Sequence, residues 1–272
     1  MIVGIDIGST TTKAVLVENN KVLKKIKTRA IDAITSGTGA FGKIVIENNL
    51  QMSDINKIMI TGVGGKKIQN DFFGISTQKV DEFTSIGIGA MFQSGKDNIV
   101  IANIGTGTVL IHADKNKITH LGGTGVGGGS ILGLSKKMLQ STTFNDIMDM
   151  ASHGKLNQVD LLVEDILEND LGFLGKEATA ANFGKMLDSA GREDIALGIL
   201  NLVYQVIGML SVFAARSKNN DTVFVTGSGS NNQIGKKIFE SISKMYKINF
   251  EFPEDSEWTT AIGAALTANL ST

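Results

Sequence analysis

Two stretches of the chain each join an apolar strand to a turn made of glycine and hydroxyl residues. In the first stretch, residues 2–5 lead to Asp6, and the turn that follows contains Gly8, Ser9, Thr10 and Thr11. Backbone amides and hydroxyl groups in such a turn can hold phosphates, while a carboxylate can position Mg²⁺, usually through water. The pattern therefore suits a phosphate site beside Asp6. The alternative is an ordinary hairpin turn with an aspartate at the end of its first strand.

The second stretch, residues 99–104, leads into a turn that contains Thr106 and Thr108, and a glycine-rich run follows at residues 121–129. Glycine loses more backbone freedom on folding than other residues, so this density indicates that something must approach the backbone closely. The usual partner is an anion at the start of a helix, and residues 130–139 are a predicted helix. We expect phosphate and substrate to be held by Thr106, Thr108 and the segment 125–130, which includes Gly128, Gly129 and Ser130.

Composition narrows the class of protein. The chain has 272 residues, a net charge of −1, 42% hydrophobic residues and no cysteine. The charge gives no reason to expect nucleic acid or an anionic membrane as a partner, and the cysteine count excludes disulfides and thiolate chemistry. The first 13 residues lack the pattern of a secretory signal, and no apolar run reaches the length of a membrane span. We therefore expect a cytoplasmic enzyme.

The two stretches are copies of one unit. Residues 2–9 align with residues 99–106 at an offset of 97, and each copy continues with a second strand, a polar turn and a third strand. Such a long period indicates a duplicated domain. We predict two lobes, residues 1–97 and 98–255, with a final helix in 256–272 that packs back on the first lobe. Lys13, in the second strand of the first copy, is either a phosphate contact or a solvated strand residue.

Hydrophobic periodicity gives the remaining elements. Helices are predicted at residues 31–49, 64–72, 82–93, 130–139, 144–151, 158–167, 179–190, 193–217, 232–246 and 258–270. Strands are predicted at residues 2–6, 13–18, 22–28, 57–60, 78–80, 222–225 and 248–252, besides those of the second copy. The helix at 193–217 is long and apolar enough to suggest a homodimer.

Several motifs together resemble a known family. The hairpins, the turn at residues 226–230 and the AIGAAL helix resemble the acetate and sugar kinase, Hsp70 and actin superfamily. Within it, NIGTGT (103–108), LGGTGVGGGSILGL (121–134), MASHG (150–154) and TAANFG (179–184) resemble the type II pantothenate kinases. The resemblance implies an α/β, duplicated actin-like (ribonuclease H-like) two-lobe fold with mixed sheets flanked by helices. It also implies phosphorylation of pantothenate to 4′-phosphopantothenate, the first step of coenzyme A biosynthesis, with ATP, Mg²⁺ and a homodimer.

The same resemblance implies roles for single residues. Glu82, in a DEF context, matches the family's catalytic base, although an acid in the first turn of a helix is also common for structural reasons. Ser228 matches the adenosine-contacting turn, and Phe144 lies where the family places an aromatic residue near the base, unless it is simply a core residue. Asp6 and its turn would hold metal and phosphates.

Two residues depart from the family pattern. His120 stands where the family has an arginine that holds the carboxylate of pantothenate, and Val109 stands where it has a substrate-contacting serine. A neutral imidazole is a poorer carboxylate anchor than a guanidinium, and valine cannot form a hydrogen bond. These departures leave open a kinase for another hydroxylated small molecule.

Two further alternatives stay open. The opening VGIDIGSTTTKAVL (3–16) also resembles the ATP-dependent activators of 2-hydroxyacyl-CoA dehydratases, but those activators hold an iron–sulfur cluster with cysteines, which this chain lacks. The other alternative is a nucleotide-binding regulator without catalytic activity.

Overall fold

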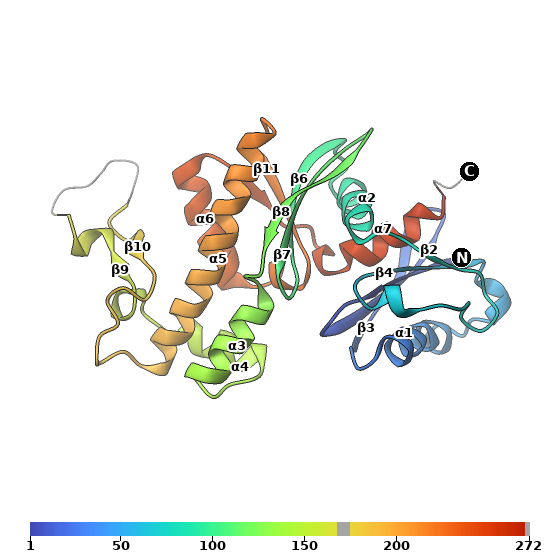
Figure 1. Cartoon of the computed structure of the whole chain (residues 1–272), viewed down its shortest axis with the longest axis horizontal. Coiled ribbons are helices and arrows are strands. Elements are labelled where there is room, and N and C mark those ends of the chain that lie inside the picture. Colours follow the sequence, from blue (N-terminus) through green and yellow to red (C-terminus); the bar gives the residue numbers. More distant parts are fainter. Residues whose placement is uncertain (168–174, 270–272) are drawn as a thin grey trace.

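The computed structural model describes residues 1–167 and 175–269, which form two lobes side by side (Figure 1). Each lobe is built on a five-stranded mixed sheet. The first sheet has the order β3-β2-β1-β4-β5 and contains β1 (Ile2–Ile7), β2 (Thr11–Glu18), β3 (Lys21–Arg29), β4 (Lys57–Thr61) and β5 (Thr77–Lys79). The second has the order β12-β11-β6-β7-β8 and contains β6 (Asn98–Ile104), β7 (Thr108–Asp114), β8 (Ile118–Thr124), β11 (Thr222–Thr226) and β12 (Asn249–Glu251).

The two sheets have the same topology. In each, the first three strands form an antiparallel meander, and two parallel strands continue the sheet on the other side of its first strand. The duplication inferred from the 97-residue offset and the predicted two-lobe α/β fold are therefore confirmed.

The helices cover both faces of each sheet. They are α1 (Ala33–Glu47), α2 (Glu82–Ser94), α3 (Gly128–Met138), α4 (Phe144–Ser152), α5 (Arg192–Ser217), α6 (Gln233–Tyr246) and α7 (Thr259–Thr267). In the first lobe, α1 packs on the face that includes Val3 and Ile5, while α7 packs on the face that includes Val15 and Val17. Successive residues of each strand point to opposite faces of the sheet, as the two-residue period of a strand requires.

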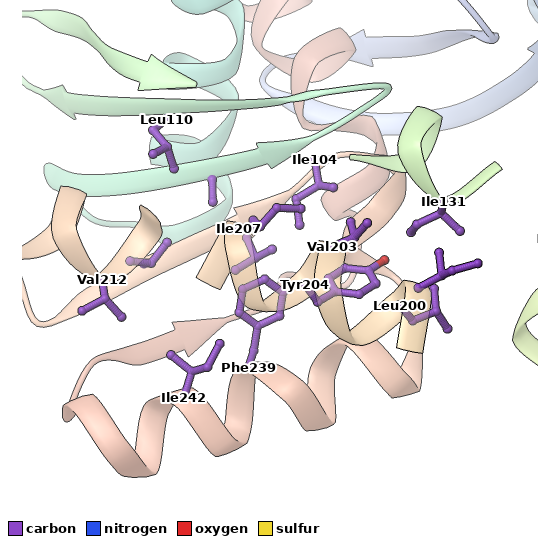
Figure 2. Packing of buried hydrophobic residues seen from close by; sticks show 14 of the residues in the cluster. Ile104, Leu110, Ile131, Leu200, Val203, Tyr204, Ile207, Val212, Phe239 and Ile242 are labelled. Atoms are coloured by element: carbon purple, nitrogen blue, oxygen red, sulfur yellow. The ribbon is translucent and has the colours of Figure 1, made fainter. Parts of the chain in front are cut away.

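The second lobe has the larger core. Its sheet packs against α5 and α6, where Figure 2 shows Tyr204, Ile207, Phe239 and Ile242 lying together. The other face of this sheet packs against α2. Thus α2 contacts the second sheet, although it precedes the second lobe in the sequence.

The helices α2 and α7 cross at glycines, so that their backbones touch. A Cβ on Gly89 would lie 2.0 Å from the carbonyl oxygen of Thr259, and a Cβ on Gly263 would lie 1.7 Å from that of Ser85. Any side chain at either position would clash with backbone. Because α2 packs on the second sheet and α7 on the first, this crossing joins the lobes.

Three predicted helices are wrong. Residues 64–72 form only the 3₁₀ turn Gly65–Lys67, because the chain there leads into the bridged turn at Phe72 and Ile75. Residues 158–167 contain the strand β9 (Leu161–Leu162) between two 3₁₀ turns. Residues 179–190 begin with the strand β10 (Thr179–Ala181), which pairs with β9.

The buried side chain of Asp160 explains the last two errors. It accepts hydrogen bonds from the amide of Phe183 (2.9 Å), the hydroxyl of Thr179 (3.1 Å) and the amide group of Asn201 on α5 (2.7 Å). These bonds fix an irregular segment against α5. Phe183 has a φ of 56° and Met186 a φ of 34°, which a right-handed helix does not allow.

By length and composition, the helix α5 could cross a membrane. This differs from the expectation that no apolar run reaches the length of a membrane span. However, 61% of its most apolar window is buried inside the protein. It is the central core helix of the second lobe. The predicted last helix is observed from Thr259, and residue 270 lies outside the described residues.

Candidate active site between the lobes

A cavity of about 520 Å³ lies between the lobes, and both glycine and hydroxyl turns line it. The Oγ of Ser9 and the Oγ1 of Thr106 lie 2.7 Å apart across it. The predicted site residues among its lining are Asp6, Gly8, Ser9, Thr10, Thr11, Lys13, Glu82, Thr106, Thr108, Gly128, Gly129, Phe144 and Ser228. Ser130 and His120 are not among them. The two turns thus face a single cavity.

Both turns are closed by their own backbone. The amide of Gly8 donates to the carbonyl of Thr11 (3.1 Å), and the amide of Gly105 donates to that of Gly107 (2.8 Å). These bonds link the ends of the antiparallel pairs β1–β2 and β6–β7. Each lobe thus contributes one closed hairpin turn, and the second turn is one residue shorter, since Ile7 pairs with Thr12 whereas Ile104 pairs with Thr108.

A row of charged side chains crosses the first sheet at the cavity. Asp6 on β1 pairs directly with Lys13 on β2, and Lys13 pairs directly with Lys27 on β3. Burial raises the pKa of Asp6, and the charge of Lys13 opposes this rise. Burial lowers the pKa of Lys13, whereas the charges of Asp6 and Glu257 raise it. Each of the two groups thus favours the charged form of the other.

Glu82 occupies the first position of α2. The helix is capped by Asp81, whose carboxylate accepts from the amide of Thr84 (2.9 Å). Burial raises the pKa of Glu82, and the negative charges of Asp6 and Asp81 raise it further. A carboxylate with a raised pKa is a better proton acceptor near neutral pH, so Glu82 has the electrostatic environment of a general base.

The glycine run packs closely against the second hairpin turn. The amide of Gly128 donates to the carbonyl of Gly105 (2.9 Å), and the amide of Gly129 donates to that of Thr106 (2.9 Å). A Cβ on Gly127 would lie 2.7 Å from the carbonyl oxygen of Thr106. The bare backbone therefore lets the start of α3 pack on the second hairpin turn. Gly128 and Gly129 line the cavity as part of that contact.

Ser130 supports the same loop from within. Its hydroxyl donates to the carbonyl of Gly125 (3.2 Å) and accepts from the amide of Gly127 (3.3 Å). Ser130 therefore fixes the loop geometry and does not line the cavity.

Ser228 and Phe144, the first residue of α4, also line the cavity. Gly227 has a φ of 86°, and its amide donates to the carbonyl of Ser256 (2.8 Å). The buried hydroxyl of Tyr204 donates to the carbonyl of Gly229 (2.7 Å). These bonds anchor the Ser228 turn to α5 and to the segment that precedes α7.

The two residues that depart from the family pattern lie in different places. Val109 lines the cavity beside Thr108, whose hydroxyl donates to the carbonyl of Val126 (2.9 Å). His120 is exposed and stacks on Phe83, with ring centroids 4.5 Å apart. The imidazole therefore contacts α2 one residue after Glu82.

Sequence reasoning missed several lining residues, notably Asn103 and Lys27. Asn103 is the equivalent of Asp6 at the 97-residue offset, so the repeat could have pointed to it; its Oδ1 accepts from the hydroxyl of Thr226 (3.0 Å). Lys27 lies opposite Lys13, which only the register of the hairpin reveals.

The residues present are compatible with Mg²⁺ held mainly by a ligand. Within residues 1–167 and 175–269, no group of three or more histidine or acidic side chains could hold a metal ion. Asp6 offers one carboxylate at the cavity. This suits Mg²⁺, which commonly keeps several waters and binds through one or two carboxylates together with substrate phosphates.

Comparison with known proteins agrees with this geometry. The model of the Fumble family matches residues 98–266. A type II pantothenate kinase of Bacillus cereus is 31% identical over 98% of this chain and 97% of its own length. One from Staphylococcus aureus is 30% identical over 97% of this chain and 98% of its own length.

Solved structures share the fold at lower identity. The activator of the 2-hydroxyisocaproyl-CoA dehydratase from Clostridium difficile, with bound ADPNP, has a TM-score of 0.71 and 19% identity, and the match covers 98% of this chain and 93% of that one. A ROK family glucokinase from Streptomyces griseus, in complex with glucose and AMPPNP, has a TM-score of 0.63 and 13% identity over 99% of both chains. Given the full-length relatives and the family match, this chain belongs to the Fumble family, the type II pantothenate kinases.

Proposed function

We propose that this kinase transfers the γ-phosphoryl group of ATP to the 4′-hydroxyl of pantothenate, in the first step of coenzyme A biosynthesis. The observation that carries the proposal is the shared cavity, in which Glu82, Asp6 and both hairpin turns meet between the lobes. The full-length similarity to enzymes named type II pantothenate kinases supports pantothenate as the acceptor.

The geometry gives each group a task. Glu82 would accept the proton of the attacking hydroxyl, because its raised pKa suits a base and it lines the same cavity as Asp6 and both hairpin turns. The turns at Gly8–Thr11 and Gly105–Thr108 would hold the phosphates with hydroxyl groups from both lobes. Asp6 would orient a hydrated Mg²⁺, which neutralises charge on the transferred phosphate when bound. Positioning and charge stabilisation would supply most of the rate enhancement.

The direct test measures ATP consumption with and without pantothenate. Strict dependence on pantothenate, with 4′-phosphopantothenate as product, would support the proposal. Hydrolysis without an acceptor would instead indicate an ATPase of the activator type, and nucleotide binding without turnover would indicate a regulator.

One observation favours a second candidate, a kinase for another hydroxylated small molecule. Val109 lines the cavity where the family pattern has a serine, so one hydrogen bond to the acceptor is missing. A competition between pantothenate and other hydroxy acids, with each product identified by mass, separates the two candidates. A hydroxy acid with a kcat/KM above that of pantothenate would replace it as the acceptor.

We also propose a cytoplasmic homodimer. An apolar groove of about 410 Å³ lies between α3 and α5 and is lined by Val126, Ser130, Gly133, Leu134, Leu202, Val203 and Val206. An exposed apolar groove of this kind often marks a contact with another protein surface. The net charge of −1 gives nucleic acid or an anionic membrane no electrostatic reason to bind.

A further inference from the structure

Two lysines face each other at the edge of the cavity, in an arrangement that costs stability. Lys13 and Lys27 are direct cross-strand partners on β2 and β3, and both line the cavity. Like charges directly opposite each other on a sheet are destabilising. Acids flank the pair on both sides: Asp6 pairs with Lys13, and Glu257 forms an ion pair with Lys27. The row therefore places two cations in the middle, where an anion would relieve their repulsion.

The order of the strands tells which end of a nucleotide lies there. In the first sheet, Lys27 on β3 lies on one side of Asp6, while Glu82, which follows β5, lies on the other. Lys27 is thus on the side away from the base that receives the acceptor's proton. Lys27 is on the side of the Ser228 turn, because its partner Glu257 belongs to the same 3₁₀ turn as Ser256. Ser256 in turn accepts hydrogen bonds from the amide of Gly227 (2.8 Å) and the hydroxyl of Ser230 (2.8 Å).

We propose that Lys27 binds the phosphates of the nucleotide that are not transferred, and that Glu257 holds the Lys27 amine in position for this contact. The proposal rests on the proposed function only in that a nucleotide occupies the cavity. The side chain of Lys27 is 44% exposed and lines the cavity, whereas that of Glu257 is only 13% exposed. A phosphate oxygen would share the ammonium group with Glu257 through a charge-assisted hydrogen bond.

The chain provides a matched control two residues away. Lys25 also lies on β3 and pairs with Asp255 (2.5 Å), in the same segment as Glu257, and it lies over the ring of Trp258. Lys25 does not line the cavity. Both pairs tie β3 to the segment before α7, so a purely structural role would appear equally in Lys25→Met and Lys27→Met.

The test measures ADP and AMP affinity by calorimetry in the full chain. We expect Lys27→Met to weaken ADP binding about tenfold, the size of one charge-assisted hydrogen bond, and to weaken AMP binding less. Lys27→Arg should keep most of the ADP affinity, and Lys25→Met should keep all of it. In turnover, the KM for ATP should rise in Lys27→Met while the KM for pantothenate stays unchanged. Equal loss in the Lys25 and Lys27 variants, or unchanged ADP affinity in Lys27→Met, would overturn the proposal.

A second variant keeps the test decisive if Lys27→Met does not fold. Glu257→Gln removes the charge that holds the Lys27 amine in position, so ADP binding should become weaker; unchanged or tighter binding would count against this arrangement. Calorimetry needs no acceptor, so these results stand apart from the proposed function. That function fails instead if the wild-type protein shows no turnover dependent on pantothenate.

Discussion

The hydroxyl oxygens of Ser9 and Thr106 lie 2.7 Å apart, and the two residues occupy equivalent positions in the sequence repeat, 97 positions from each other. Each lies in the hairpin turn of its own lobe. The contact therefore marks the place where the two copies meet, at the cavity that both turns line. A phosphate held between the turns can accept hydrogen bonds from hydroxyl groups of both lobes. Nucleotide binding would therefore draw the two lobes together.

The first prediction concerns this pair. Ser9→Ala and Thr106→Ala should each weaken ATP binding about fivefold, because each removes one hydroxyl worth about 1 kcal/mol. Calorimetric titration checks the affinity. Ser152→Ala, on the exposed end of α4, removes a hydroxyl that does not line the cavity and should leave the affinity unchanged. If both site variants bind ATP as the wild type does, the hydroxyls do not contact the nucleotide.

The second prediction concerns Glu82. Glu82→Gln should lower kcat by about 10²- to 10⁴-fold, the usual contribution of a general base, while ATP affinity is preserved. The wild-type rate should fall on the acid side with an apparent pKa above that of an ordinary glutamate, because burial and the charges of Asp6 and Asp81 raise the pKa of Glu82. A pH profile of kcat/KM checks this. An acid limb at the ordinary glutamate pKa would contradict the assignment.

The third prediction follows from the same raised pKa. Since the folded state binds the Glu82 proton more tightly than the unfolded state does, this group favours folding at low pH, and that contribution is lost as the pH rises through the folded pKa. At neutral pH the ionised Glu82 therefore costs stability, and Glu82→Gln should melt at a higher temperature than the wild type. The difference should shrink as the pH falls toward the ordinary glutamate pKa. A lower melting temperature for the variant at pH 7 would show that the carboxylate stabilises the fold.

The fourth prediction concerns the crossing of α2 and α7. Gly89→Ala and Gly263→Ala should each destabilise the protein by about 3 kcal/mol, the upper end of the usual cost of overpacking, because the new methyl would meet backbone oxygen at 2.0 Å and 1.7 Å. Chemical denaturation measures this. Gly39→Ala in α1, where a Cβ would meet nothing within 4 Å, should instead add about 0.5–1 kcal/mol. Similar effects at all three glycines would mean that the crossing is not tight.

Sequence patterns predict well those strands and turns that are determined by residues close together in the sequence. The offset between residues 2–9 and 99–106 was enough to predict two equivalent sheets, because the alternation of apolar residues and the turn residues were both present in each copy. The helices at 158–167 and 179–190 were wrong because one buried carboxylate, Asp160, organises both segments through bonds to residues up to 41 positions away. No periodicity reveals such a long-range hydrogen bond.

The same limit applies to the residues of the candidate site. Residues within the turns, such as Ser9 and Thr106, could be found from composition and repeat. The position of His120 could not be predicted in this way, since its stacking on Phe83 depends on how α2 packs against the second sheet. Finding Lys27 required the strand register, which the lysines at positions 21, 24, 25 and 27 do not define.

The last prediction concerns acceptor specificity. Val109 lines the cavity next to Thr108, so Val109→Ser would place a hydroxyl where the family pattern has one, and the KM for pantothenate should fall about fivefold with little change in kcat. His120→Arg restores the other family residue, but the imidazole stacks on Phe83 outside the cavity lining, so this change should leave the KM for pantothenate within about twofold. Steady-state kinetics of the two variants, at saturating ATP, checks both. A larger gain from His120→Arg than from Val109→Ser would show that residue 120, on β8, reaches the acceptor, and an unchanged KM in both variants would point to an acceptor other than pantothenate.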